Sequence, residues 1–139
     1  MQAGPSSSNL VATRLQHAIN EHDLDALASC FAADYVNDTP VHPSRSFVGR
    51  DQVRKNWVHI FAAVPDIKAD LLRCTRAGDT VWTEWEMAGT RIDGRRHLMR
   101  GVSVMKEKDG VIASTRFYLE PVEEGGEDID TIIHKALGR

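Results

Sequence analysis

The sequence predicts an α+β protein in which helices gather on one face of a curved antiparallel sheet. Apolar residues recur at helical spacing up to about residue 31, and again over residues 50–63. From residue 66 onward they alternate at strand spacing, in segments of about ten residues. Short turns containing Gly beside Asp separate these segments, which is typical of consecutive hairpins.

The N-terminal half is predicted to hold three helices and one short strand. Residues 10–21 form the first helix, and the second follows after a link so short that the two must be neighbours. Asp23 is a suitable N-cap for the second helix, whose apolar stripe runs to Phe31. Residues 31–40 end that helix, turn at Ala33 and Asp34, and begin the strand. A proline-containing loop then leads to the third helix, over residues 50–63.

The C-terminal half is predicted to form strands over residues 66–75, 80–90, 97–108 and 111–120. Side chains of a strand alternate between its two faces, so the more apolar set marks the inward face. The side chains expected to point inward are Val81, Thr83, Trp85, Met87, Met99, Gly101, Ser103, Met105, Thr115, Phe117 and Leu119. Glu120 is expected to point outward.

The domain is expected to cover residues 10–121, and a chain of this length can bury a core of its own. Residues 1–9 are interpreted as a disordered lead-in, and residues 122–139 as an acidic linker followed by a short amphipathic helix. That helix presents an apolar face that is not stable alone in water. It is therefore expected to dock on its own domain or on a second copy.

Composition argues against several classes of partner. The net charge is −3 and no long basic surface is present, so nucleic-acid binding is not expected. No apolar run approaches membrane-spanning length, and the protein is interpreted as cytoplasmic, with no membrane partner. Cys30 and Cys74 have no Cys-x-x-Cys partner and are interpreted as buried free thiols. We expect no metal and no cofactor.

A polar pair on the first strand is the strongest indication of a site. Tyr35 and Asn37 share one face of that strand, and they suit either the anchoring of a ligand oxygen or a satisfied buried network. We expect them to line an apolar pocket for a small hydrophobic molecule. Its other expected lining residues, which could equally be plain core, are Trp57, Trp85, Met87, Ser103 and Phe117.

Three titratable residues are candidates for acid–base chemistry, each with a simpler alternative. Asp38 lies one residue off the inward face and suits hydrogen bonding within the following turn. His42 lies in the loop at the expected pocket mouth, and His97 begins a strand near the opposite rim. A histidine in either place is more commonly a solvated surface residue.

The outer face of the sheet mixes aromatic residues with opposite charges. Trp82 and Tyr118 lie there beside Glu84, Arg100 and Arg116. Cross-strand ion pairs account for part of this pattern without a partner. Aromatic residues are enriched in interfaces, so the same face is also expected to form a homodimer.

The chain resembles the nuclear-transport-factor-2-like superfamily, including its SnoaL-like polyketide cyclases. The resemblance is carried, in order, by residues 18–27 (AINEHDLDAL), 31–34 (FAAD), 49–51 (GRD), 109–112 (DGVI) and 116–118 (RFY). It implies a cone-shaped α+β barrel with a pocket between helices and sheet, commonly in a homodimer.

The enzymes of that superfamily provide residue-by-residue comparisons. Tyr35-Val36-Asn37 is similar to the Tyr-x-Asn with which limonene-epoxide hydrolases position water. The Arg and Asp residues that those enzymes also use correspond here to Trp85, Met87 and Phe117. The Asp of SnoaL-type cyclases falls near the last of these. The acid–base residues of ketosteroid isomerases correspond to Thr39, Leu15 and Ser103.

Three functions are therefore open at the level of sequence. The first is an isomerase, cyclase or hydrolase acting on a small hydrophobic compound, which a titratable group in the cavity would favour. The second is a non-catalytic ligand-binding protein, which an uncharged cavity would favour. The third is a dimeric interaction protein using the outer sheet face and the terminal helix.

Overall fold

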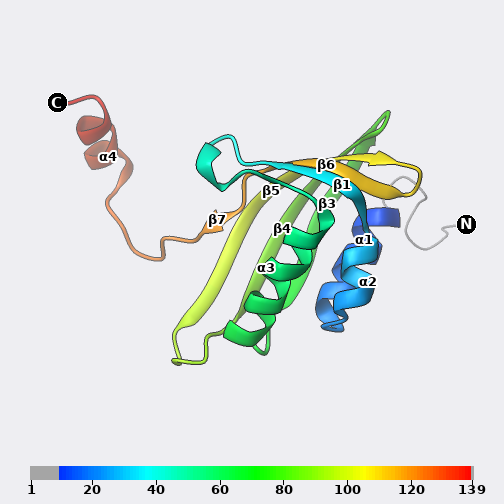
Figure 1. The fold of residues 1–139 in the computed structure, drawn as a ribbon. Helices are drawn as coiled ribbons and strands as arrows, with labels where there is room; N and C mark the ends of the chain where they lie inside the picture. The colour runs from blue at the N-terminus through cyan, green and yellow to red at the C-terminus, as the bar shows by residue number, and fades with distance from the viewer. Residues whose placement is uncertain (1–9, 139) are drawn as a thin grey trace, which may run out of the picture.

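The computed structural model describes residues 10–138 and has the predicted α+β architecture. The N-terminal helices lie against the concave face of one curved sheet (Figure 1). The helices are α1 (Leu10–Asn20), α2 (Leu24–Ser29), α3 (Arg50–Ala63) and α4 (Ile129–Ala136), with the short 3₁₀ helix η2 (Pro43–Arg45). The strands are β1 (Phe31–Asp38), β2 (Phe47–Val48), β3 (Lys68–Ala77), β4 (Thr80–Thr90), β5 (Arg96–Lys108), β6 (Val111–Phe117) and β7 (Glu120–Pro121).

The sheet is mixed, whereas the sequence predicted an antiparallel one. Its strand order is β2-β1-β6-β5-β4-β3, with β7 paired to β5. The three predicted hairpins β3–β4, β4–β5 and β5–β6 are antiparallel and are confirmed. The exception is β1, which lies parallel to β6. No tight turn joins these two strands, so no local signal fixed their relative direction.

The helices close one open edge of the sheet as well as its concave face. Strand β3 ends the strand order, and side chains of α1 satisfy its free backbone groups. Asn20 both accepts from the Ala69 amide at 2.7 Å and donates to the Ala69 carbonyl at 2.9 Å. Gln16 accepts from the Leu71 amide at 2.5 Å. These contacts occupy the edge of β3 around residues 69–71 and block strand pairing there.

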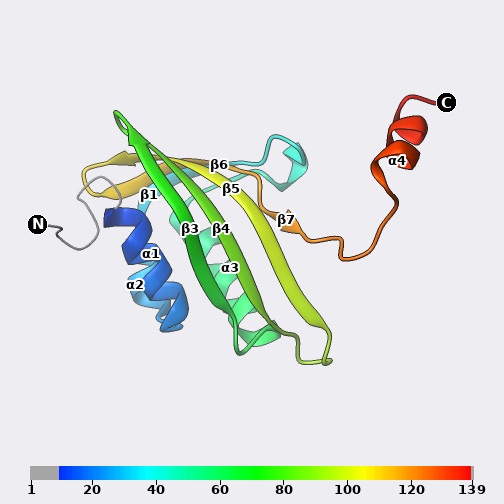
Figure 2. The ribbon, with the colours of Figure 1, turned by 180° about the vertical axis from the view of Figure 1, so that it is seen from behind.

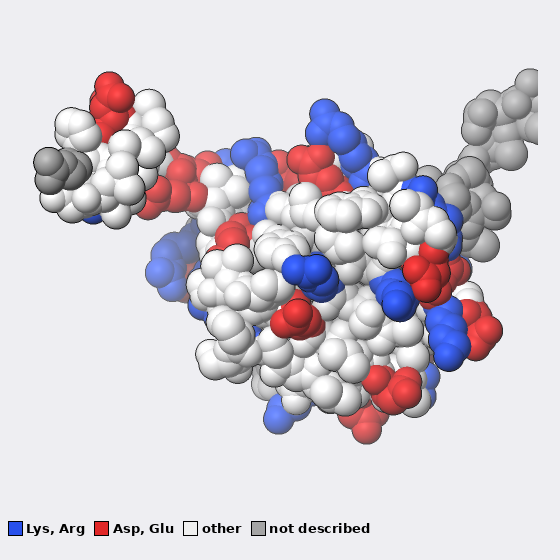
Figure 3. Space-filling view, turned by 90° about the horizontal axis from the view of Figure 1, so that it is seen from above, with Lys and Arg blue, Asp and Glu red and all other residues white. Residues whose placement is uncertain are grey.

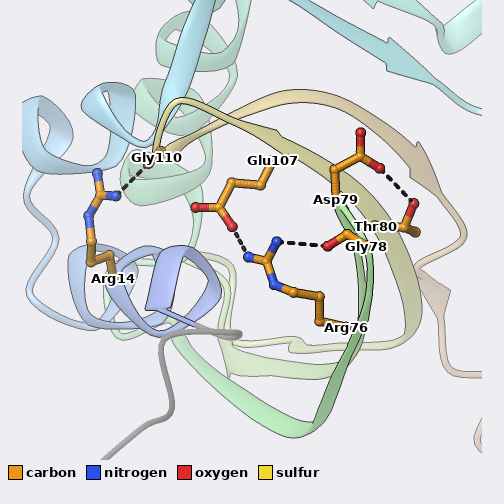
Figure 4. Close-up of polar contacts among 7 residues, drawn as sticks. All are labelled: Arg14, Arg76, Gly78, Asp79, Thr80, Glu107 and Gly110. Atoms are coloured by element: carbon orange, nitrogen blue, oxygen red, sulfur yellow. Dashed lines mark hydrogen bonds and ion pairs between the residues drawn. The ribbon is translucent and has the colours of Figure 1, made fainter.

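The hairpin ends far from α4 are held together by two arginines (Figure 4). Arg14 of α1 donates to the carbonyl of Gly110, in the β5–β6 turn, at 2.8 Å. Arg76 of β3 donates to Gly78 and forms an ion pair with Glu107 of β5. These contacts join the first helix and both hairpins into one closed end.

The predicted inward faces are confirmed. Val81, Thr83 and Trp85 are at most 2% exposed, while Trp82 on the opposite face of the same strand is 49% exposed. On β5, Ser103 and Met105 are buried. The opposite face of β3–β5 carries none of the helices formed by residues 10–138 (Figure 2).

Local predictions around residue 31 were wrong. Asp23 caps α2 as predicted, accepting from the Ala26 amide at 3.0 Å, but the helix ends at Ser29 and Phe31 already belongs to β1. The predicted turn at Ala33 and Asp34 is instead a register irregularity within that strand. Phe31 was placed in the helix because it continues the helical spacing of the apolar residues before it. The irregularity after it hides the alternation that is typical of a strand.

The predictions for the two ends of the chain have different outcomes. The predicted lead-in, residues 1–9, lies outside the described residues. The terminal helix is present as α4, separated from the body of the molecule (Figure 1). Within residues 10–138, no helix is both long and apolar enough to cross a membrane.

Candidate functional site: a cavity between helices and sheet

A cavity of about 270 Å³ lies between α3 and the concave face of the sheet. This is near the lower end of the size usual for small-molecule sites, roughly 300–1,000 Å³. Its walls are mainly apolar. The seven residues expected to form a pocket, Tyr35, Asn37, Trp57, Trp85, Met87, Ser103 and Phe117, all line it.

The backbone at the start of α3 fixes the position of Tyr35. Gly49 has φ of +105°, which few residues other than glycine adopt, and its amide donates to the Tyr35 carbonyl at 2.6 Å. The Tyr35 ring lies edge-on to Phe31, with ring centroids 4.8 Å apart. The phenol is therefore held at one wall of the cavity.

A chain of polar side chains runs along β1 beneath the cavity. The Tyr35 hydroxyl donates to Oδ1 of Asn37 at 2.8 Å, and Nδ2 of Asn37 donates to Oγ1 of Thr39 at 3.0 Å. All three residues are buried and line the cavity. They share one strand face because their positions differ by two.

Burial affects the protonation of Tyr35. It raises the pKa of the phenol above its ordinary value, and a hydrogen bond with Thr115 offsets only part of the rise. The phenol is therefore a neutral hydrogen-bonding group at physiological pH. Ser103 lies among the same lining residues, is 6% exposed, and its hydroxyl has no hydrogen bond to another described residue. A buried hydroxyl of this kind favours a bound polar atom.

Replacement of Tyr35 by Phe is expected to reduce stability in a pH-dependent way. At neutral pH the loss is about 1–2 kcal/mol, because Asn37 loses a buried partner. Since the folded state resists ionisation of this phenol, the contribution of Tyr35 is present below about pH 10 and falls at higher pH. Urea unfolding of both proteins should show their stability difference shrinking above pH 10. A difference that stays constant to pH 11.5 would contradict this assignment.

Among residues 10–138, two charged residues line the cavity, and both are at its exposed end. They are Arg45, from η2, and Glu120, from β7. The carboxylate of Glu120 lies 3.1 Å from Nε2 of His42, and the two side chains are 42% and 33% exposed. The sequence pattern placed Glu120 on the outer face, and its pairing with Arg100 of β5 agrees with that. What the pattern did not indicate is that this side chain lies at the rim of the cavity.

The predicted acid–base candidates occupy three separate places. His42 lies beside the mouth, behind Glu120. Asp38 is exposed and remains off the inward face, with its nearest recorded partner the Ser46 hydroxyl at 3.5 Å. His97 borders a different surface hollow, beside Arg91 and His59. Burial and then Arg91 lower the pKa of His97. Neither Asp38 nor His97 reaches the cavity.

Other lining residues were not singled out in the sequence. Asn56 of α3 accepts from Gln52 at 2.8 Å, and Thr115 of β6 is 4% exposed. Thr115 was predicted to point inward, but nothing in its pattern separated it from core. Among residues 10–138, no three His, Cys, Asp or Glu side chains are placed to hold a metal ion.

This architecture, with helices over a curved sheet and a cavity between them, defines a nuclear-transport-factor-2-like fold. The sequence model of the SnoaL-like domain matches residues 12–115, about three quarters of the chain. The chain therefore belongs to the SnoaL-like domain family. Comparison with curated proteins gives no match.

Solved structures agree on the fold. IdmH of Streptomyces antibioticus, a candidate polyketide cyclase, is 21% identical with a TM-score of 0.70, over 96% of this chain and 100% of that one. An epoxide hydrolase of M. tuberculosis is 18% identical with a TM-score of 0.69, over 81% and 82%. A ketosteroid-isomerase-like protein from Catenulispora acidiphila, in complex with trimethylamine, is 20% identical with a TM-score of 0.67, over 81% and 87%.

Proposed function

We propose that the protein binds a small, mainly apolar organic molecule in this cavity and catalyses a proton transfer on it. The observation that carries the proposal is the arrangement of the cavity, which has apolar walls, neutral hydrogen-bonding groups inside, and a carboxylate–histidine pair at its mouth. The reaction class is isomerisation or cyclisation of a carbonyl compound. Relatives on this fold include a candidate cyclase and a hydrolase, which supports a cavity used for chemistry.

The roles follow from position. Ser103, whose hydroxyl is free to donate, would orient the oxygen of the ligand by a hydrogen bond, while Trp57, Trp85, Met87 and Phe117 would pack on its apolar part. Glu120 is the general base, because it is the carboxylate that lines the cavity. His42, behind it and partly exposed, would exchange the proton with solvent. Asp38 and His97 have no role in this proposal.

A base next to an apolar cavity can be tested without knowing the natural substrate. The probe is 5-nitrobenzisoxazole, a flat apolar molecule. A base removes the proton from C3, the C–H electrons form the nitrile, and the N–O bond breaks to leave a phenolate. We expect the wild type to catalyse this reaction and Glu120→Gln to be slower by about 10²-fold. The matched control is Glu124→Gln, on the exposed linker, which should retain the wild-type rate.

A second variant tests whether both turnover and binding depend on the cavity. Ser103→Phe should fill the cavity and abolish both turnover and the thermal stabilisation given by small apolar ketones. Equal rates for the wild type and Glu120→Gln would overturn the assignment of the base. If ketones still stabilised both proteins, the non-catalytic ligand-binding function would be the better one. The observation favouring that alternative is that the charged lining residues of the described chain are confined to the mouth.

A further inference from the structure

Helix α4 is a complete amphipathic helix that lies apart from the body of the molecule (Figure 1). Asp128 caps it, accepting from the Thr131 amide at 2.9 Å, and Lys135 pairs with Glu127 at 2.7 Å. Its apolar side chains are nonetheless exposed: Ile129 at 71%, Ile132 at 41%, Ile133 at 45% and Leu137 at 68%. An isolated helix of eight residues is marginal in water, so this face requires an apolar partner.

The tail leaves the sheet in a fixed direction. The Val122 amide donates to the Leu98 carbonyl at 3.0 Å, and Glu124 lies 3.4 Å from Arg96. The tail therefore runs antiparallel to β5, toward the beginning of that strand. Seen from above, α4 lies beyond the body of the molecule, on the side where β7 ends (Figures 1 and 3).

An apolar groove of suitable character lies on the outer face of the sheet. It is formed across β4, β5 and β6, where Trp82 is 49% exposed. Val102, Val104 and Tyr118 complete its floor, and Lys106 and Arg116 supply positive charge. No helix in the described part of the chain covers this face (Figure 2).

Charge on the tail complements the groove. Residues 122–139 contain five acidic and two basic residues, so the tail accounts for the net charge of −3 of the whole chain. Two of the acidic residues, Asp128 and Asp130, lie at the N-terminal end of α4. Its apolar face can therefore lie on Trp82 while its acidic end meets Lys106 or Arg116.

The length and direction of the linker indicate whether α4 can dock in the groove of its own chain. From Glu124, beside Arg96, the four residues 125–128 extend at most about 14 Å. Along β5, Val104 lies eight residues from Arg96, roughly 26 Å away at strand spacing. The tail also points away from that end of the strand. The acidic first turn of α4 therefore cannot reach Lys106, beyond Val104 on the same strand, in its own chain while Glu124 and Val122 keep their contacts. The rest of the helix could reach that groove only if the tail reversed its direction.

We propose that α4 docks in the outer-face groove of a second copy of this chain, and that the second copy returns its own α4. Reciprocal exchange of this kind closes a two-fold dimer, because the same two surfaces meet twice. It would join the expected homodimer and the terminal helix in one interface. The interface is on the opposite face of the sheet from the cavity, so it is independent of the proposed chemistry.

The test compares Ile133→Asp with His134→Asp by sedimentation equilibrium of the full chain. The two variants introduce the same charge at adjacent positions, on the apolar and polar faces of α4. We expect the wild type and His134→Asp to be dimers, and Ile133→Asp to associate at least tenfold more weakly. Trp82→Ala should weaken association similarly. An unchanged far-ultraviolet circular dichroism spectrum would show that each variant still folds.

Two results would overturn the proposal. A dimer that tolerates both Ile133→Asp and Trp82→Ala would mean that the copies pair without the tail. A monomeric wild type would also overturn it, and an increase in acrylamide quenching of Trp82 fluorescence in Ile133→Asp would then place α4 on its own chain.

Discussion

Gly101→Ala is expected to lower the free energy of unfolding by at least about 3 kcal/mol. Gly101 has φ of +152°, and a Cβ at this position would lie 2.3 Å from the Tyr118 carbonyl oxygen and 2.7 Å from the Leu119 Cα. Both obstacles are backbone atoms, which cannot move aside as a flexible side chain can. The strand pair β5–β7, and with it Glu120 at the cavity mouth, depends on this close approach. Urea unfolding with an unchanged m-value measures the loss.

Gly78→Ala is the matched control for this effect. Gly78 also has positive φ, +63°, but nothing lies within 4 Å of the position of its Cβ. The free energy of unfolding of Gly78→Ala should fall only by the cost of holding alanine at a positive φ, about 1 kcal/mol. Equal losses in the two variants would mean that backbone conformation, and not the contact with Tyr118, makes glycine necessary at residue 101.

Trp85→Ala is expected to have the largest effect among side-chain truncations, about 3–5 kcal/mol. Trp85 is 2% exposed and forms part of the cavity wall. Its Nε1 donates to Oγ1 of Thr83 at 2.8 Å, and Thr83 donates to the Ser103 carbonyl at 2.6 Å. Truncation enlarges a space that already exists and leaves Thr83 without a donor. Chemical denaturation should therefore show the loss directly.

Trp82→Ala provides a control in the same strand with the same residue type. Trp82 is on the opposite face and 49% exposed, so at concentrations where the chain is monomeric its loss should be below about 1 kcal/mol. If the two variants were equally stable, Trp85 would not be part of a packed wall. The inward assignment of the odd-numbered face of β4 would then be wrong.

The hairpins of the sheet were predictable because their information is local. Turns at residues 77–79, 92–95 and 108–110 contain Gly beside Asp, and Asp109 and Gly110 both have positive φ, as such turns require. The alternation of Val81, Thr83 and Trp85 then identified the inner face. The parallel pairing of β1 with β6 was not predictable, since about seventy residues separate the two strands and no turn connects them directly.

The residues that form the walls of the cavity were easier to predict from the sequence than those at its mouth. Tyr35 and Asn37 were identifiable because polar residues on an inward strand face are unusual, and strand period alone placed Trp85 and Ser103 on the inward faces of their strands. Glu120 was missed because it belongs to a two-residue strand whose position depends on Gly101, seventeen residues before Tyr118 and eighteen before Leu119. Its pairing with His42 joins segments 78 residues apart, for which no sequence pattern exists.

The most direct measurement is diffraction from crystals held under xenon, which enters apolar cavities that water leaves empty or poorly ordered. We expect a xenon site bounded by Trp85, Ser103 and Phe117, and its loss in Ser103→Phe. Crystals in which these three side chains pack together with no xenon between them would contradict the existence of a ligand cavity.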